Sequence, residues 1–163
     1  MGWFALDDIK AEAAAFKELA TDAFHFLVKE FGFQPVKSEG DSVRYQSAKV
    51  YVNISLGRVS KEIRIEIGLL PGQYDQVSHS FGLDEIIESM DNRNEIEYLY
   101  FQGETKEQLQ KNLPFLAGLV KKYAGDVLRG DYLVIQNLER LRSDSSLGLG
   151  KPVKIRQTYF DWI

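Results

Sequence analysis

The stretch VYVNISLGRVSKEIRIEIGL, residues 50–69, decides the fold of this chain. Apolar and polar residues alternate on both sides of a four-residue connection at residues 57–60. Such a period of two is typical of half-buried strands, and so short a connection permits only an antiparallel hairpin. The residues predicted to face the core are Val50, Val52, Ile54, Leu56, Ile63, Ile65, Ile67 and Leu69.

A third strand is predicted just before this hairpin, at residues 43–46, with another short connection at residues 47–49. The three strands form an antiparallel meander that ends at Pro71 and Gly72. Glu62, Arg64 and Glu66 fall on the face opposite to the apolar one. We therefore expect that face to meet water or a partner.

The segment before the sheet is predicted to be one long helix that covers the apolar face of the meander. Its apolar residues recur at steps of three and four, which places them on one stripe. Gly32 follows the last of them and can adopt the left-handed conformation that ends a helix. The stripe consists of Ile9, Ala13, Phe16, Ala20, Ala23, Leu27 and Phe31.

Further elements are predicted after the sheet. A polar loop at residues 73–80 precedes a short helix at residues 83–90, and residues 96–102 form a strand by their aromatic content. Thr105 and Gln108 form a capping-box pattern that opens a third helix. Its apolar stripe keeps its phase through Pro114, so we expect a kink there and a continuation to Val127.

A fourth helix is predicted after Gly130 and Asp131, with Val134, Ile135, Leu138 and Leu141 facing inward and an end near residue 142. Residues 153–163 form a last strand or a docked extension. The predicted fold class is therefore α+β: an antiparallel β-meander packed against a long N-terminal helix and followed by C-terminal helices.

The composition favours one globular domain over residues 1–163, with 44% apolar and 27% charged residues. The chain has no cysteine, which excludes disulfides, thiolate metal sites and cysteine nucleophiles. Its net charge of −4 argues against nucleic acid or an anionic membrane as the main partner. Neither a signal peptide nor an apolar run that could span a bilayer is visible, so we expect a cytoplasmic protein.

No motif in the chain specifies a catalytic reaction. The two histidines, His25 and His79, are too far apart for a metal-binding pattern, so no metal or other cofactor is predicted. The run Gly148-Leu149-Gly150-Lys151 is followed by Pro152 where a phosphate-binding loop requires Ser or Thr. No catalytic residue is assigned.

The distribution of charge is the most informative feature of the sequence. Eight acids and a single base, Arg93, lie between Asp75 and Glu104. Acids at the start of the 83–90 helix are favoured by the helix dipole, but Glu88 and Asp91 lie at the opposite end, where negative charge is unfavourable. A solvated helix face is one interpretation, and a surface that attracts a basic protein and anchors it with aromatic side chains is the other. The predicted partner-binding residues are Asp84, Glu85, Glu88, Asp91, Glu95, Glu97, Tyr98 and Tyr100.

The order of these parts resembles that of the small cytoplasmic bacterial immunity proteins of polymorphic toxin systems. The residues that carry the resemblance are Phe26-Leu27 and Phe31-Gly32-Phe33 at the end of the first helix, Val43-Arg44-Tyr45 at the start of the sheet, Glu62-Ile63, and Leu128-Arg129-Gly130-Asp131 before the last helix. The resemblance implies a stoichiometric binder that occludes the active site of a basic enzyme. It assigns no functional residue, because such families bind through differing surfaces.

The sequence thus favours a non-enzymatic protein-binding domain, of which an immunity-type inhibitor of a basic toxin or enzyme is one form. The alternative is an enzyme or small-ligand-binding protein with carboxylate, tyrosine or lysine groups in a pocket between sheet and helices. A homodimer formed through the open sheet face or through residues 159–163 is a third possibility.

The string Glu97-Tyr98-Leu99-Tyr100-Phe101-Gln102-Gly103 resembles the recognition sequence of a viral protease that is used to remove purification tags. Its position inside the chain favours coincidence. If this segment is folded, we expect the bond between Gln102 and Gly103 to resist that protease.

Overall fold

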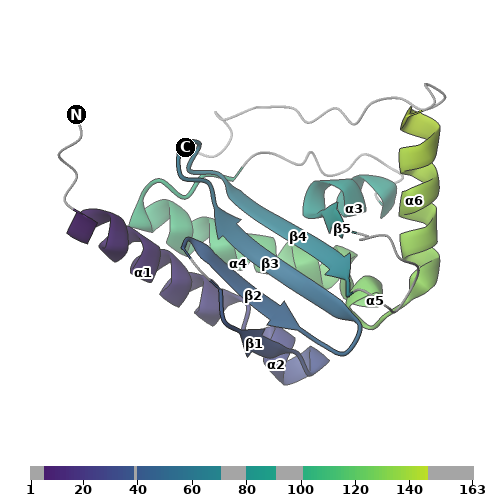
Figure 1. The fold of residues 1–163 in the computed structure, drawn as a ribbon, viewed down its shortest axis with the longest axis horizontal. Helices are drawn as coiled ribbons and strands as arrows, with labels where there is room; N and C mark the ends of the chain where they lie inside the picture. The colour runs from purple at the N-terminus through teal and green to yellow at the C-terminus, as the bar shows by residue number, and fades with distance from the viewer. Residues whose placement is uncertain (1–5, 39, 71–79, 91–100, 147–163) are drawn as a thin grey trace.

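The fold is that of a computed structural model, which describes residues 6–38, 40–70, 80–90 and 101–146 (Figure 1). Its helices are α1 (Leu6–Ala23), α2 (Phe26–Phe31), α3 (Leu83–Met90), α4 (Lys106–Tyr123), α5 (Gly125–Leu128) and α6 (Tyr132–Ser146). Its strands are β1 (Gln34–Val36), β2 (Ser42–Gln46), β3 (Val50–Leu56), β4 (Ile63–Leu69) and β5 (Ser80–Gly82). Mixed α+β architecture with an antiparallel sheet is therefore confirmed.

The sheet is an antiparallel meander whose strands follow chain order, β1-β2-β3-β4-β5. The predicted hairpin is β3 and β4, in which Val52 pairs with Ile67 and Ile54 with Ile65. The predicted third strand is β2. Strands β1 and β5 were not predicted, because strands of three residues are too short to show an alternation and form only by pairing with a neighbouring edge.

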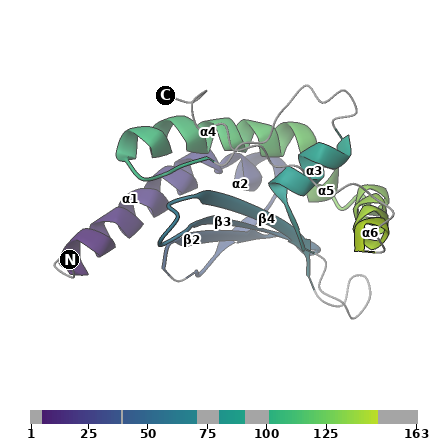
Figure 2. The same ribbon diagram turned by 90° about the horizontal axis from the view of Figure 1, so that it is seen from above.

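Helices cover one face of the sheet. Figure 2 shows α1 and α4 above β2, β3 and β4, with α3 above the β5 side. Within the part of the chain that the structure describes, no helix or strand covers the opposite face. The fully buried core side chains include Phe16, Phe24, Leu27, Phe33, Tyr45, Ile54, Ile63, Ile67, Leu83, Ile86, Ile87 and Leu113.

The N-terminal helix is shorter than the prediction. Helix α1 ends at Ala23, and α2 begins three residues later at Phe26. At the junction Leu27 N–H donates to the Phe24 carbonyl and Val28 N–H to the His25 carbonyl, which are bonds of the tighter 3₁₀ type. Apolar steps of three and four suit both a tight turn and a continuous helix, so the spacing could not reveal the break.

The predicted end of this segment is confirmed. Gly32 has a φ of +71°, in the left-handed region that glycine adopts without strain. Phe33 N–H then donates to the Leu27 carbonyl at 2.9 Å, as in a Schellman ending. Phe33 is only 1% exposed, so the cap also directs an aromatic ring into the core.

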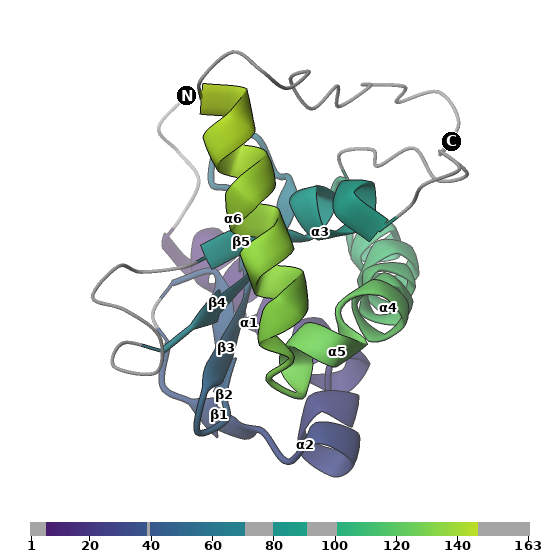
Figure 3. The ribbon, with the colours of Figure 1, turned by 90° about the vertical axis from the view of Figure 1, so that its right-hand side faces the viewer.

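Helix α4 passes through Pro114 as predicted, but it ends at Tyr123, and Val127 belongs to the separate helix α5. Helix α6 lies beside α5 at the β5 side of the molecule (Figure 3) and continues to Ser146, beyond the predicted end. In α6, Ile135 and Leu138 are buried, whereas Leu141 is 44% exposed, so its predicted inward position is wrong. None of the described helices is both long and apolar enough to cross a membrane.

Candidate functional site

The acidic surface that the sequence predicts is described in part. Asp84, Glu85 and Glu88 lie on α3, which follows β5 directly. Asp84 and Glu85 are half-buried, and Glu88 is exposed. The other predicted residues, Asp91, Glu95, Glu97, Tyr98 and Tyr100, lie outside the described residues.

The two acids in the first turn of α3 help to form the junction between β5 and the helix. The backbone N–H of Gly82 donates to Glu85 Oε1 at 3.3 Å, which satisfies a free amide at the helix start. The carboxylate of Asp84 folds back so closely over Gly82 that a side chain at position 82 would collide with it. Part of the negative charge on α3 therefore stabilises the helix through its dipole.

Glu62, the residue directly before β4, joins the acids of α3. Its side chain is only 14% exposed, and its carboxylate lies 3.8 Å from the Arg64 guanidinium. Burial raises the pKa of Glu62; Arg64 lowers it and the negative charge of Asp84 raises it again. The pKa remains above its ordinary value, so the ion pair does not offset the burial and the repulsion.

Glu88 stands in the same electrostatic relation to Asp84. Although the residue is exposed, the protein around its carboxylate excludes enough water to raise the pKa of Glu88, and Asp84 raises it further. Asp84 thus lies close enough to influence both Glu62 and Glu88. We call these three residues the acidic cluster. Sequence reasoning placed Glu62 only on the polar strand face, since nothing in the linear order shows that β4 begins beside α3.

The aromatic residue next to the predicted acidic segment is internal. Phe101 is 3% exposed, and its ring lies 5.5 Å from that of Phe115 on α4. The Phe101 carbonyl accepts a hydrogen bond from Ile63 N–H at the start of β4. Phe101 therefore belongs to the core and does not anchor a partner.

The open face of the sheet carries a polar cluster around Tyr51. The Arg44 guanidinium lies 4.2 Å from the centre of the Tyr51 ring, and the Tyr51 hydroxyl donates to Glu66 Oε1 at 2.8 Å. Burial raises the pKa of Tyr51, and its hydrogen bond to Glu66 raises it further. A tyrosine held in its protonated form is a hydrogen-bond donor and not an activated base. The arrangement therefore stabilises the sheet.

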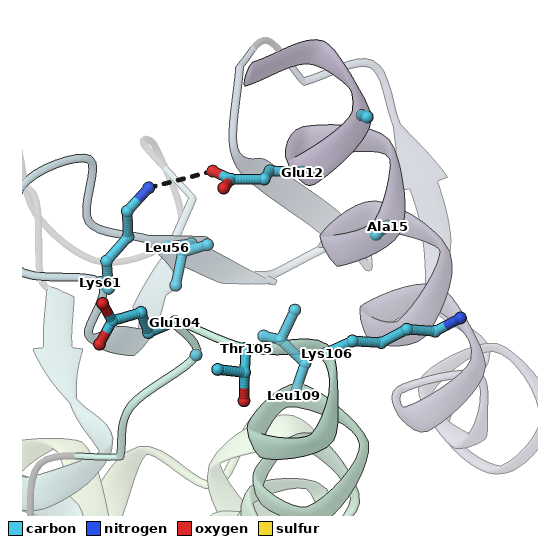
Figure 4. Close-up of a pocket in the computed structure, with 10 residues that line it drawn as sticks. Glu12, Ala15, Leu56, Lys61, Glu104, Thr105, Lys106 and Leu109 are labelled. Carbon is cyan, nitrogen blue, oxygen red and sulfur yellow. Dashed lines mark hydrogen bonds and ion pairs between the residues drawn. The ribbon is translucent and has the colours of Figure 1, made fainter. Parts of the chain in front are cut away.

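A cleft of about 240 Å³ opens between α1, the start of α4 and the loop from β3 to β4 (Figure 4). Glu12, Lys61 and Glu104 lie at its rim, and Lys61 Nζ pairs with Glu12 Oε2 at 3.2 Å. This cleft is a sheet-helix pocket with the carboxylate and lysine groups that the alternative function requires. Its residues were not among those predicted, because they come from three segments that are distant in the sequence.

A second, shallower hollow of about 340 Å³ lies at the end of the sheet near the β2–β3 turn. Lys49 and Arg129 line it, and the Arg129 guanidinium stacks 5.0 Å from the centre of the Phe31 ring. Across the described ranges no three His, Asp or Glu side chains are grouped so that they could hold a metal ion.

Comparison with known proteins gives no relative. No family model matches the chain, and neither the curated proteins nor the solved structures contain a match.

Proposed function

We propose that this protein is a non-enzymatic binding protein that holds a basic protein partner on its acidic cluster. The observation that carries the proposal is that burial, and in addition the negative charge of Asp84, raises the pKa of both Glu62 and Glu88. Burial and the charge of Asp84 both disfavour the ionised forms of Glu62 and Glu88 in the free protein, so their ionisation opposes folding. A lysine or arginine of a partner would relieve the repulsion by Asp84. Binding would therefore remove an unfavourable electrostatic contribution that remains in the folded, unbound protein.

The predicted residues Asp91, Glu95, Glu97, Tyr98 and Tyr100, which lie outside the described residues, remain part of the proposal. The carboxylates would steer a cationic partner toward the site and accelerate association at low ionic strength. The two predicted tyrosines would supply apolar contact area and a hydrogen-bonding hydroxyl.

The alternative of an enzyme has less support from the positions of the titratable groups. Acid-base catalysis requires a carboxyl or similar group whose pKa is shifted and which lines a cavity. The carboxyls with a raised pKa, Glu62 and Glu88, do not line the cleft beside Lys61. Among the described residues, the separation of these two carboxyls from this cleft favours a binding protein.

A lysine-rich peptide can test whether a cationic partner binds at the acidic cluster in preference to other acidic residues. We expect an octalysine peptide to shift the backbone NMR signals of residues 62, 84 and 88 at low salt, and these shifts to fade as salt is added. Glu88→Lys combined with Asp91→Lys should weaken binding, mainly through a slower and less salt-sensitive association. Shifts spread evenly over the acids of α1 and α4 would refute the proposal.

The matched control is Glu18→Lys combined with Asp22→Lys. Both residues are exposed on α1, and the pair changes the net charge by the same amount as the reversal on the proposed surface. Equal weakening by both pairs would show that net charge alone attracts the peptide, and would also count against a defined site.

The biological form of the partner follows from the resemblance noted in the sequence. An immunity-type protein would bind a basic toxin in the cytoplasm and occlude its active site. The protein encoded by the adjacent gene is the first candidate, and its binding should show the same dependence on Glu88 and Asp91.

A further inference from the structure

The cleft beside Lys61 has an apolar floor. Leu56 from the end of β3 and Leu109 from the first turns of α4 form the floor, and Ala11 and Ala15 form the wall on α1. Leucines leave apolar surface at the bottom, while alanines on the facing helix are too small to fill the space above them. The cleft is therefore suited to a short apolar group.

Gly103 allows the chain to pass this close to the floor. A Cβ at this position would lie 2.6 Å from Leu109 Cδ2 and 3.0 Å from Leu56 Cδ1. Its N–H donates to the Lys61 carbonyl at 2.7 Å. The glycine thus joins the segment before α4 to the loop that carries Lys61.

Lys61 is held at the mouth of the cleft in an unusual backbone conformation. Its φ is +56°, and among the described residues it is the one non-glycine residue with a positive φ. Such a conformation costs about 1–3 kcal/mol and persists where the surroundings impose it. Here Lys61 N–H donates to the Gly57 carbonyl at 3.0 Å, and the Lys61 carbonyl accepts from Gly103. These backbone bonds fix the main chain from which the Lys61 side chain reaches Glu12.

The charges at the mouth have both signs. Lys61 Nζ meets Glu12 Oε2 across the opening, and Glu104 lies beside Lys61, whereas Lys106 points away (Figure 4). The side chains of Lys61 and Glu12 are 32% and 59% exposed, so water and small solutes can reach them. An ammonium paired with one carboxylate, above an apolar floor, is complementary to a molecule that carries both charges beside an apolar group.

We propose that this cleft binds a free aliphatic α-amino acid, with L-leucine as the representative ligand. The ligand's ammonium group would contact Glu12, its carboxylate would replace Glu12 on Lys61, and its side chain would rest on Leu56 and Leu109. The volume of about 240 Å³ is below the ~300–1,000 Å³ of clefts that hold drug-sized ligands, which suits a molecule of this size. This site shares no residue with the acidic cluster, so it is independent of the proposed protein-binding function.

The first test is calorimetric titration of the full chain with three molecules that differ only in charged groups. L-Leucine carries both charges, 3-methylbutylamine lacks the carboxylate, and 4-methylpentanoate lacks the ammonium group. We expect saturable binding of L-leucine with a Kd of about 1 mM or below. Each single-charge analogue should bind more weakly than L-leucine by a factor of about ten or more, because one charge-assisted contact is lost. Absence of saturable leucine binding, or equal affinity for all three, would overturn the proposal.

Two alanine variants on the same helix test the location. Ala15 lines the cleft, whereas Ala14 is exposed and does not line it. Ala15→Leu should abolish leucine binding, and Ala14→Leu should leave it unchanged. Equal binding by both variants would place the ligand elsewhere and contradict the proposal.

A charge variant keeps the proposal testable if Ala15→Leu does not fold. Lys61→Met removes the ammonium but retains an unbranched side chain of similar length. We expect it to weaken L-leucine and 4-methylpentanoate about tenfold or more and to leave 3-methylbutylamine unchanged, because that amine has no carboxylate to contact. A uniform loss for all three molecules, or no loss for L-leucine, would contradict the assigned role of Lys61.

Discussion

Single residues decide how closely the sheet of this protein can pack. At Gly68 on β4, the backbone lies directly beneath the Tyr51 ring of β3, and the two residues are register partners. A Cβ at position 68 would lie 2.6 Å from the Tyr51 hydroxyl oxygen. The ring can therefore reach both Arg44 and Glu66 only because residue 68 has no side chain.

We expect Gly68→Ala to destabilise the protein by about 1–3 kcal/mol, because the added methyl displaces Tyr51 and overpacks the site. Urea unfolding measures this loss. Gly118→Ala on α4 is the matched control, since nothing lies within 4 Å of a Cβ there. That control should stabilise by roughly 0.5–1 kcal/mol, because alanine favours a helix interior over glycine. A loss of stability at position 118 equal to that at 68 would contradict this account.

At the scale of elements, the short segment before α4 belongs to the sheet edge. Glu62 and Gln102 form an antiparallel bridge, and Gly103 N–H donates to the Lys61 carbonyl. The Asn112 amide on α4 donates to the Gln102 carbonyl at 2.7 Å, so the helix also holds this segment. Backbone bonded in this way cannot enter a protease active site in an extended form without local unfolding.

The viral protease whose recognition sequence resembles residues 97–103 can test whether these bonds hold the segment before α4 in place. We expect no cleavage between Gln102 and Gly103 in the native protein, because both residues are bonded to neighbouring elements. Cleavage should appear when urea unfolds the chain to an extent that the protease tolerates, and mass spectrometry would identify the fragments. Rapid cleavage without denaturant would show that the bridge does not form.

At the same scale, sequence patterns predicted elements better than they predicted boundaries. Alternation identified β2, β3 and β4, and the capping box identified the start of α4, where Gln108 N–H donates to Thr105 Oγ1 at 3.1 Å. These signals are local, since each depends on residues a few positions apart. The strand β5 depends on its pairing with β4, which no local pattern contains. The break between α1 and α2 consists of local 3₁₀-type bonds, and its apolar spacing suits a continuous helix equally well.

At the scale of the whole molecule, the fold brings like charges together from separate segments. Glu62, the residue before β4, and Asp84 on α3 are distant in the sequence, yet burial and the charge of Asp84 together raise the pKa of Glu62. The folded state therefore holds a proton on Glu62 more readily than the unfolded chain does. It follows that ionised Glu62 lowers the free energy of unfolding above its raised pKa, and that this loss disappears as the pH falls through that pKa.

We expect Glu62→Gln to increase the free energy of unfolding at pH 7, because the amide cannot ionise. The gain should shrink as the pH falls, and vanish below the unfolded-state pKa of about 4.3, where the wild-type carboxyl is protonated in both states. Urea unfolding at a series of pH values measures the difference. Glu18→Gln, at an exposed position on α1, is the control and should show little change at any pH.

A destabilising effect of Glu62→Gln at pH 7 would show that the ion pair with Arg64 outweighs burial and repulsion. That result would also contradict the acidic cluster as a binding surface. A Glu62 carboxylate already neutralised by Arg64 would leave no repulsion for a partner to relieve.

The sequence by itself determined the fold class, the meander, the helix caps and the acidic character of the α3 region, because hydrophobic period, turn chemistry and charge are properties of neighbouring residues. The tertiary structure decided that Glu62 belongs with Asp84 and Glu88 and that Glu12, Lys61 and Glu104 surround one cleft. The physical reason is distance: electrostatic repulsion and a cavity depend on positions in space, and residues that are far apart along a chain acquire those positions only when the core between them forms.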